Sequence, residues 1–290
     1  MQKIENNELR VYISEKGAEM QTLTDVKTGR EYFWQGDPKY WDGRSPVLFP
    51  ATGGLWNDTY RYDGKEWKMP KHGFVKAKEW EVAKHTKCSV TFTYKLTDED
   101  LAFFPFPSQV FVTYRLRGRK VVVDFLVKNQ GTRTMYFQMG GHPAFNLPDF
   151  KEGSKQDAYI RLEGNPDHIL RARHQGCIQP ERFEVPYDKT GNIPVCVQTF
   201  ANEALIFEKS QVKAATLVDL KGNDIVRVTT TAPCWLFWSM QDLHCPYVCF
   251  EPWYGLPDDE EYAGLYQQRP YLNKAAKGKT WEGKYTIEVF

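Results

Sequence analysis

Hydrophobic and polar residues alternate along much of the chain. Segment 90–96 places valine, phenylalanine, tyrosine and leucine at every second position, and segment 110–116 repeats the pattern. A period of two is typical of a β-strand with one buried face. The runs 121–127 and 285–289 predict further strands of this kind. The pattern therefore predicts a largely antiparallel β-protein.

The connections between the predicted strands carry turn signals. Lys221-Gly222-Asn223-Asp224 separates the β-rich runs 215–220 and 225–231, and its glycine and asparagine can adopt the positive φ of a hairpin turn. The 17 prolines and 21 glycines leave no long helical pattern. We expect an all-β fold, a large antiparallel β-sandwich with few short helices, formed by residues 1–290 as a single domain.

Composition narrows the functional classes. Hydrophobic residues make up 41% of the chain, enough for a sizeable core, and the 38 basic and 37 acidic residues nearly balance. This balance argues against nucleic-acid binding, which favours a basic surface. No apolar run approaches the roughly 18 residues that a membrane span requires. Residues 1–13 lack the apolar core of a secretory signal, so we expect a cytoplasmic protein without membrane insertion.

The six cysteines show no CxxC pair, which favours free thiols over disulfides. His244, Cys245 and Cys249 could suggest zinc, but the Cys-x3-Cys spacing has no second pair nearby. We expect no metal. The sequence leaves the oligomeric state open between a monomer and a homodimer.

Three segments interrupt the alternation with polar residues between turn-forming and aromatic ones: 70–74, 140–146 and 250–258. In the second, two glycines allow close backbone approach, and Pro143 restrains His142 to an extended conformation. In the third, Glu251 follows the apolar run 247–250 and precedes a proline. We expect this carboxylate at the rim of a sheet among aromatics, where burial would raise its pKa toward that of a useful base.

These segments, together with Ser45–Pro50 and Ala201–Phe207, closely resemble motifs of the aldose 1-epimerase (galactose mutarotase) family, in particular its LacX-like branch. The resemblance extends over roughly the whole chain and keeps the order of the motifs. It implies a galactose mutarotase-like β-supersandwich with an open cleft for a pyranose. The implied reaction interconverts the α and β anomers of a hexose and needs neither a metal nor a redox cofactor.

The resemblance also implies residue roles. Glu251 matches the family's general base, His142 its general acid, and His72 a second histidine that contacts the sugar near its ring oxygen. Glu203, Trp253 and Asn146 are implied as sugar-binding residues. Opening a hemiacetal removes the proton of the anomeric hydroxyl and protonates the ring oxygen, and each positioned proton transfer contributes roughly 10²- to 10⁴-fold.

Two departures from the family pattern keep other functions open. Gly54 stands where many members carry an arginine, and Glu203 where many carry an aspartate, so a non-catalytic carbohydrate-binding protein is one alternative. A glycoside hydrolase is another, because Glu251 with Asp258 or Glu203 could form a carboxylate pair. The two histidines match proton transfer near neutral pH better than glycosidase chemistry. Structural roles are the remaining alternative: a turn histidine at 72, a core histidine at 142, a salt bridge at 251 and core packing at Trp253.

Overall fold

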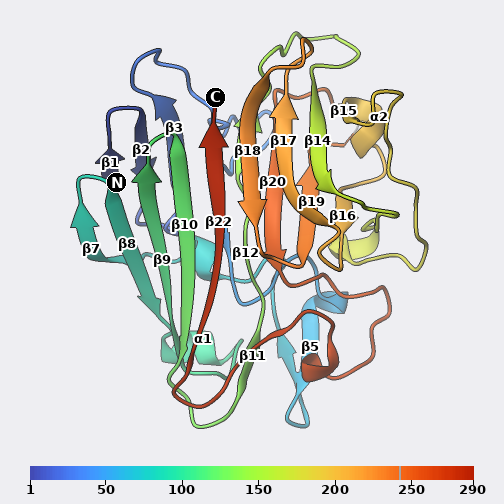
Figure 1. The fold of residues 1–290 in the computed structure, drawn as a ribbon. Coiled ribbons are helices and arrows are strands. Elements are labelled where there is room, and N and C mark those ends of the chain that lie inside the picture. The colour runs from blue at the N-terminus through green and yellow to red at the C-terminus, as the bar shows by residue number, and fades with distance from the viewer. Residues whose placement is uncertain (242) are drawn as a thin grey trace.

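The computed structural model describes residues 1–241 and 243–290, and its main elements are two large antiparallel sheets (Figure 1). The larger sheet has nine strands in the order β15-β14-β17-β18-β22-β10-β9-β8-β7. In that order its strands are Ile193–Val195, Ala158–Gly164, Val212–Val218, Asp224–Thr230, Thr280–Val289, Lys120–Asn129, Ser108–Arg117, Ser89–Lys95 and Glu81–Thr86.

The second sheet has the order β16-β19-β20-β12-β4, and β13 also pairs with β20. These strands are Leu205–Phe207, Cys234–Trp238, Tyr247–Tyr254, Met139–Gly141, Val47–Leu48 and, for β13, Ala144–Asn146. Three small sheets accompany them: β1-β2-β3 (Gln2–Glu5, Leu9–Ile13, Met20–Asp25), β5-β6 (Thr59–Tyr62, Lys65–Lys68) and β11-β21 (Met135–Phe137, Asn273–Ala275).

Helical segments in the described residues are short, as predicted. The α-helices are α1 (Asp98–Leu101) and α2 (Val197–Phe200), and the 3-10 turns are η1 (Trp56–Asp58), η2 (Val75–Ala77), η3 (His174–Gly176) and η4 (Tyr266–Gln268). None of the helices in the described ranges is long and apolar enough to cross a membrane.

The strands predicted from alternation are confirmed as β8, β9, β10 and β22. In β9 buried and partly exposed residues alternate over nine positions, because one face packs on the core. The predicted hairpin joins β17 to β18. Gly222 supplies its positive φ of 93°, and the Asp219 carboxylate accepts hydrogen bonds from the backbone N–H groups of Lys221 and Asn223.

The two large sheets pack face to face around a shared core. Phe237 and Phe250 of the six-stranded sheet belong to the same buried cluster as Val123 and Phe125 of the nine-stranded sheet. The contact is close: a Cβ atom on Gly141 would lie 2.8 Å from the Tyr285 ring of β22. The predicted β-sandwich is therefore confirmed. The aromatic ring of the opposite sheet leaves no room for a side chain at Gly141.

Candidate functional site

Glu251 lies inside a strand, and its predicted position at the rim of a sheet is wrong. Strand β20 continues through Pro252 to Tyr254, and all eight of its residues are buried. β20 is an interior strand, with β19 on one side and β12 and β13 on the other. The proline fits because the neighbouring chain is interrupted between β12 and β13, where fewer ladder hydrogen bonds are required.

The sheet register brings His142 and Glu251 together. Gly140 of β12 lies opposite Trp253, and Ala144 of β13 lies opposite Cys249. Both pairings share one register, so the intervening His142 stands opposite Glu251. Residues directly opposed in an antiparallel pair place their side chains on the same face. The fold thus joins two residues that are far apart in the sequence.

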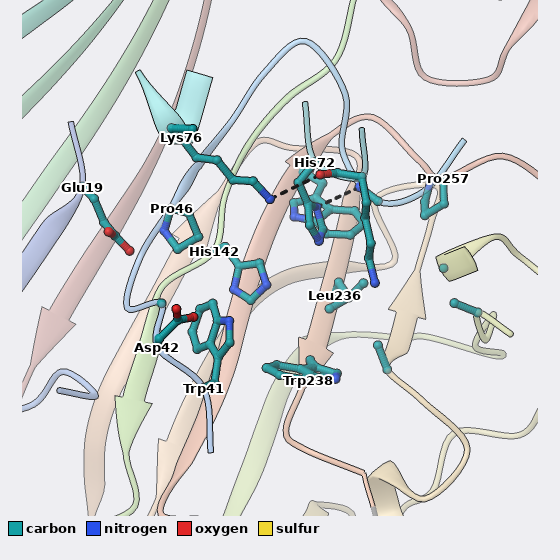
Figure 2. Close-up of a pocket in the computed structure, with 18 of the residues that line it drawn as sticks. Glu19, Trp41, Asp42, Pro46, His72, Lys76, His142, Leu236, Trp238 and Pro257 are labelled. Atoms are coloured by element: carbon teal, nitrogen blue, oxygen red, sulfur yellow. Dashed lines mark hydrogen bonds between the residues drawn. The ribbon is translucent and has the colours of Figure 1, made fainter. Parts of the chain in front are cut away.

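That same face of the six-stranded sheet forms the floor of a cavity of about 700 Å³ (Figure 2). Ile206 of β16 lies opposite Leu236 of β19, and both line the cavity. Two tryptophans also line the cavity: Trp238, two residues after Leu236 in β19, and Trp253, two residues after Glu251 in β20. The opposite face of these strands packs into the core through Phe237 and other aromatics. Alternation thus separates a ligand-facing side from a core-facing side.

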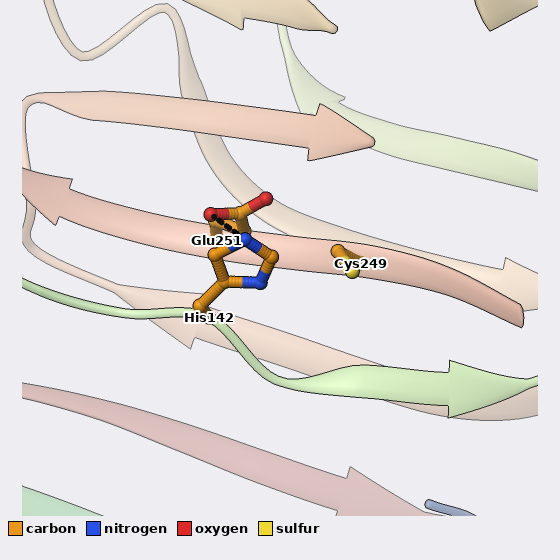
Figure 3. A group of neighbouring side chains, drawn as sticks. All are labelled: His142, Cys249 and Glu251. Atoms are coloured by element: carbon orange, nitrogen blue, oxygen red, sulfur yellow. Dashed lines mark ion pairs between the residues drawn. The ribbon is translucent and has the colours of Figure 1, made fainter. Parts of the chain in front are cut away.

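His142 and Glu251 form a close pair at this floor (Figure 3). His142 Nε2 lies 3.2 Å from Glu251 Oε2, and the two side chains are 9% and 0% exposed. His142 lines the cavity, whereas the Glu251 carboxyl lies behind the imidazole and does not line it. Neither carboxyl oxygen has a well-aligned hydrogen bond to the described residues. Buried polar groups are normally satisfied, so an unsatisfied carboxyl at a cavity floor favours a functional role.

Burial disfavours the charged forms of both members of the pair. It raises the pKa of the Glu251 carboxyl well above its usual range, and the Lys71 charge only partly opposes the shift. Burial lowers the pKa of His142 to about 3. A proton on the Glu251 carboxyl lies close to His142 Nε2, which is 3.2 Å from Oε2 and can accept it. Moving this proton from the carboxyl to the imidazole creates a carboxylate and an imidazolium without net proton uptake.

These shifts predict opposite pH effects on stability. The contribution of Glu251 is fully present below its ordinary pKa of 4.5 and is lost as pH rises through the raised folded pKa. The contribution of neutral His142 is present above 6.5 and is lost as pH falls toward about 3. Urea unfolding from pH 5 to 9 should therefore show wild type losing stability relative to Glu251→Gln as pH rises. A difference that stays constant over this range would contradict the raised pKa.

His72 is held beside His142 in a strained turn. Its φ of 67° lies in the left-handed region, which costs a non-glycine residue about 1–2 kcal/mol. Two hydrogen bonds offset this cost: its N–H donates to the Gly53 carbonyl at 2.9 Å, and Gly53 N–H donates to Nδ1 at 3.1 Å. The rings of His72 and His142 lie 5.5 Å apart, and both line the cavity. Burial keeps the pKa of His72 well below its usual range, so the neutral ring offers Nε2–H as a donor.

Glu203 and Trp253 also line the cavity, whereas Asn146 does not. Glu203 sits at a turn with φ of 66°, and the buried Arg171 guanidinium donates to its carbonyl at 2.9 Å. The Asn146 amide donates instead to the backbone carbonyls of Phe33 at 2.8 Å and Glu31 at 3.2 Å. These hydrogen bonds hold the Asn146 amide against the backbone, and its sugar contact stays a prediction.

Gly54 leaves no room for a side chain. A Cβ atom there would lie 2.1 Å from the Gln175 carbonyl oxygen, and the Gly54 carbonyl accepts a hydrogen bond from Asp258 N–H at 3.0 Å. An arginine at this position would require the loop to be rebuilt. Close packing of the backbone therefore accounts for the absence of an arginine side chain at this position.

Sequence reasoning missed Trp41 and Trp238. The Trp41 ring stacks on His142 at 4.8 Å and 29°, and it meets Trp238 edge-on at 5.7 Å. Figure 2 shows Trp41 beside His142 at the cavity. The aromatic loop Trp34–Gly43, punctuated by glycine and proline, was the available signal. These rings offer apolar surfaces on which a sugar face can pack.

One group in the described residues has donor atoms close enough for a metal ion. His142, Cys249 and Glu251 each offer one ligand atom, all within 4.8 Å of one another (Figure 3). This is a different set from the one weighed in the sequence, because His244 contacts Asp157 and Cys245 Sγ lies 2.9 Å from Ser239 Oγ. Burial raises the pKa of the Cys249 thiol well above its usual range, so this donor is a protonated thiol. Metal independence stays a prediction.

Known proteins resemble this chain over almost its whole length. A family model for aldose 1-epimerase matches residues 1–258. The chain is 28% identical to Protein LacX (plasmid) of Lactococcus lactis subsp. lactis over 305 residues, which cover 99% of this chain and 98% of the relative. It is 31% identical to the structure of a galactose mutarotase related enzyme from Lactobacillus acidophilus, with a TM-score of 0.91 over 100% of this chain and 97% of that one. A galactose mutarotase-like protein from Lactobacillus casei is 27% identical with a TM-score of 0.93 over 100% of both chains. The chain therefore belongs to the aldose 1-epimerase family.

Proposed function

We propose that this protein is an aldose 1-epimerase that interconverts the α and β anomers of a hexose with a free anomeric hydroxyl. The observation that supports this most is the His142–Glu251 pair at the floor of a cavity lined by aromatics. Its volume falls within the roughly 300–1,000 Å³ range of small-molecule sites. The pair supplies one group that can accept a proton and one that can donate a proton.

In the proposed mechanism, the carboxyl proton of Glu251 first moves to His142 and leaves Glu251 as a carboxylate. Glu251 removes the proton of the anomeric hydroxyl while His142 protonates the ring oxygen, and the C1–O5 bond breaks. Rotation about C1–C2 presents the other face of the aldehyde. The reverse transfers close the ring as the other anomer. His72 donates Nε2–H near the ring oxygen, and Glu203 and Trp253 contact the sugar.

The position of Glu251 places a condition on this mechanism. Because His142 covers the carboxyl, the imidazole has to turn aside before the anomeric hydroxyl can reach Glu251. Trp41 stacks on the imidazole and must shift with it. We propose that the entering sugar replaces the Trp41 contact and uncovers the carboxyl.

The same burial favours a second candidate, a non-catalytic carbohydrate-binding protein in which Glu251 is a structural partner of His142. Polarimetry of freshly dissolved α-D-galactose or α-D-glucose separates the two. An epimerase accelerates the approach to the anomeric equilibrium, whereas a binding protein leaves the buffer rate unchanged. The acceleration should persist in EDTA, and its loss with the chelator would refute a metal-independent mechanism.

A glycoside hydrolase is less well supported by the geometry. Asp258, one of the two carboxylates considered as a partner for Glu251, is buried in an ion pair with Arg269. It is engaged in fixing a loop and does not line the cavity. Release of phenol from aryl glycosides would support a glycoside hydrolase instead.

A further inference from the structure

Two lysines without an acidic partner lie next to the histidines. Lys71 and Lys76 line the cavity, and both are close to His72 in the chain. Among the described residues neither forms an ion pair, whereas the nearby Lys78 pairs with Asp100 at 2.7 Å. Two positive charges are thus left at one end of the cavity.

The two lysines are positioned by packing and by backbone contacts. Lys76 Nζ donates to the Lys71 carbonyl at 3.3 Å, and its side chain extends toward His72 (Figure 2). The Lys71 side chain runs across Gly176 of η3, where a Cβ atom would lie 3.0 Å from Cε and 3.1 Å from Nζ. Glycine at 176 therefore leaves the space that the Lys71 ammonium occupies.

The acidic residues that line the cavity are Glu19, Asp42 and Glu203, and none of them forms an ion pair with either lysine in the described residues. Glu19 Oε1 accepts the backbone N–H groups of Arg44 at 2.9 Å and Ser45 at 2.8 Å. In Figure 2 Glu19 and Asp42 lie away from His72. Burial and the neighbouring Lys71 charge lower the pKa of Lys76, and the Glu19 charge opposes this shift only in part. An anion bound between them would relieve this repulsion.

We propose that the sugar substrate carries an anionic group, a phosphate or a carboxylate, on its exocyclic carbon, and that Lys71 and Lys76 bind this group. The inference rests on the proposed function, which places the ring oxygen near His72. In an aldohexopyranose the exocyclic carbon is attached to C5, which also bears the ring oxygen. A group on that carbon therefore falls on the His72 side of the sugar, where the two lysines lie.

The test compares affinities for a neutral sugar and its anionic forms. Calorimetry measures binding of D-galactose, D-galactose 6-phosphate and D-galacturonate to wild type and to Lys71→Gln/Lys76→Gln. We expect at least one anionic sugar to bind roughly tenfold or more tightly than galactose at low salt, since charge-assisted contacts are strong. The advantage should shrink in high salt and disappear in the double variant. The two anions identify whether the site prefers a phosphate or a carboxylate.

Lys84→Gln, which alters an exposed lysine on edge strand β7, is the matched control and should keep the wild-type preference. Equal affinity for all three sugars, or an anionic advantage that survives the double variant, overturns the inference. Anomerisation of the same sugars is followed separately by NMR exchange. Lysine-dependent binding without faster anomerisation rejects the proposed function alone, and faster anomerisation without an anionic preference rejects this inference alone.

Discussion

Replacing Glu251 with glutamine should lower the enzymatic rate of anomerisation by roughly 10²- to 10⁴-fold, the usual contribution of one positioned proton transfer. Glutamine keeps the shape of the side chain but cannot accept the hydroxyl proton. Sugar binding should remain, because the aromatic rings and His72 that line the cavity are unchanged. NMR exchange between the anomers gives the rate, and calorimetry gives the affinity.

The variant must fold for this comparison to be informative. An amide is neutral, and burial already favours the neutral form of the Glu251 carboxyl, so the substitution adds no buried charge. Glu81→Gln on the exposed strand β7 makes the same chemical change outside the cavity and should retain full activity. A folded Glu251→Gln protein with the wild-type rate would show that the carboxyl is not the base.

Asp258→Asn should lower the free energy of unfolding by about 3–5 kcal/mol, the cost of leaving one member of a buried ion pair without its partner. The Arg269 and Asp258 side chains are 3% and 1% exposed, and Arg269 Nη2 lies 2.7 Å from Asp258 Oδ2. Trp56 N–H donates to the same carboxylate oxygen at 3.0 Å. Asparagine preserves the volume but leaves the guanidinium buried without a counter-charge.

Urea denaturation of wild type and variant measures this loss. Asp63→Asn is the matched control, because it removes an ion pair of the same length, 2.7 Å to Arg133, whose side chains are 59% and 56% exposed. Solvent screens that pair, so the control should unfold at the same urea concentration as wild type. Equal midpoints for all three proteins would show that the Arg269 charge is satisfied without Asp258.

The sequence predicted the strands that have one buried face. The periodic runs in β8, β9, β10 and β22 are visible because each strand contacts the core on one side and solvent on the other. β20 is buried on both faces and has no such alternation. Nothing in the local pattern shows that the strand continues past Pro252, so the sequence predicts a rim position for Glu251.

Local context singles out Glu251, His142 and His72 in the sequence, but only the fold shows their geometry. It brings the two histidines to one cavity and places the Glu251 carboxyl next to His142. The contact of Trp41 with His142 and the pair of lysines depend on loops folding back across the sheet, which no local pattern encodes. Asn146 belongs to the same motif as His142, but its amide donates to the Phe33 carbonyl and it does not line the cavity, which the motif alone does not reveal.

The alignment of β12 and β13 on β20 means that the distance along the chain from Gly140 to Ala144 is as important as the residues themselves. An insertion or deletion of one residue there would turn the imidazole to the core side, since strand side chains alternate in direction. In the loop 37–46 the Arg44 carbonyl accepts the N–H of Ala144 at 2.9 Å, but the part of the loop that carries Trp41, residues 37–43, pairs with no strand. Substrate preference in such a protein can therefore evolve through changes in loop length around Trp41. The segment between β12 and β13 has to keep its length.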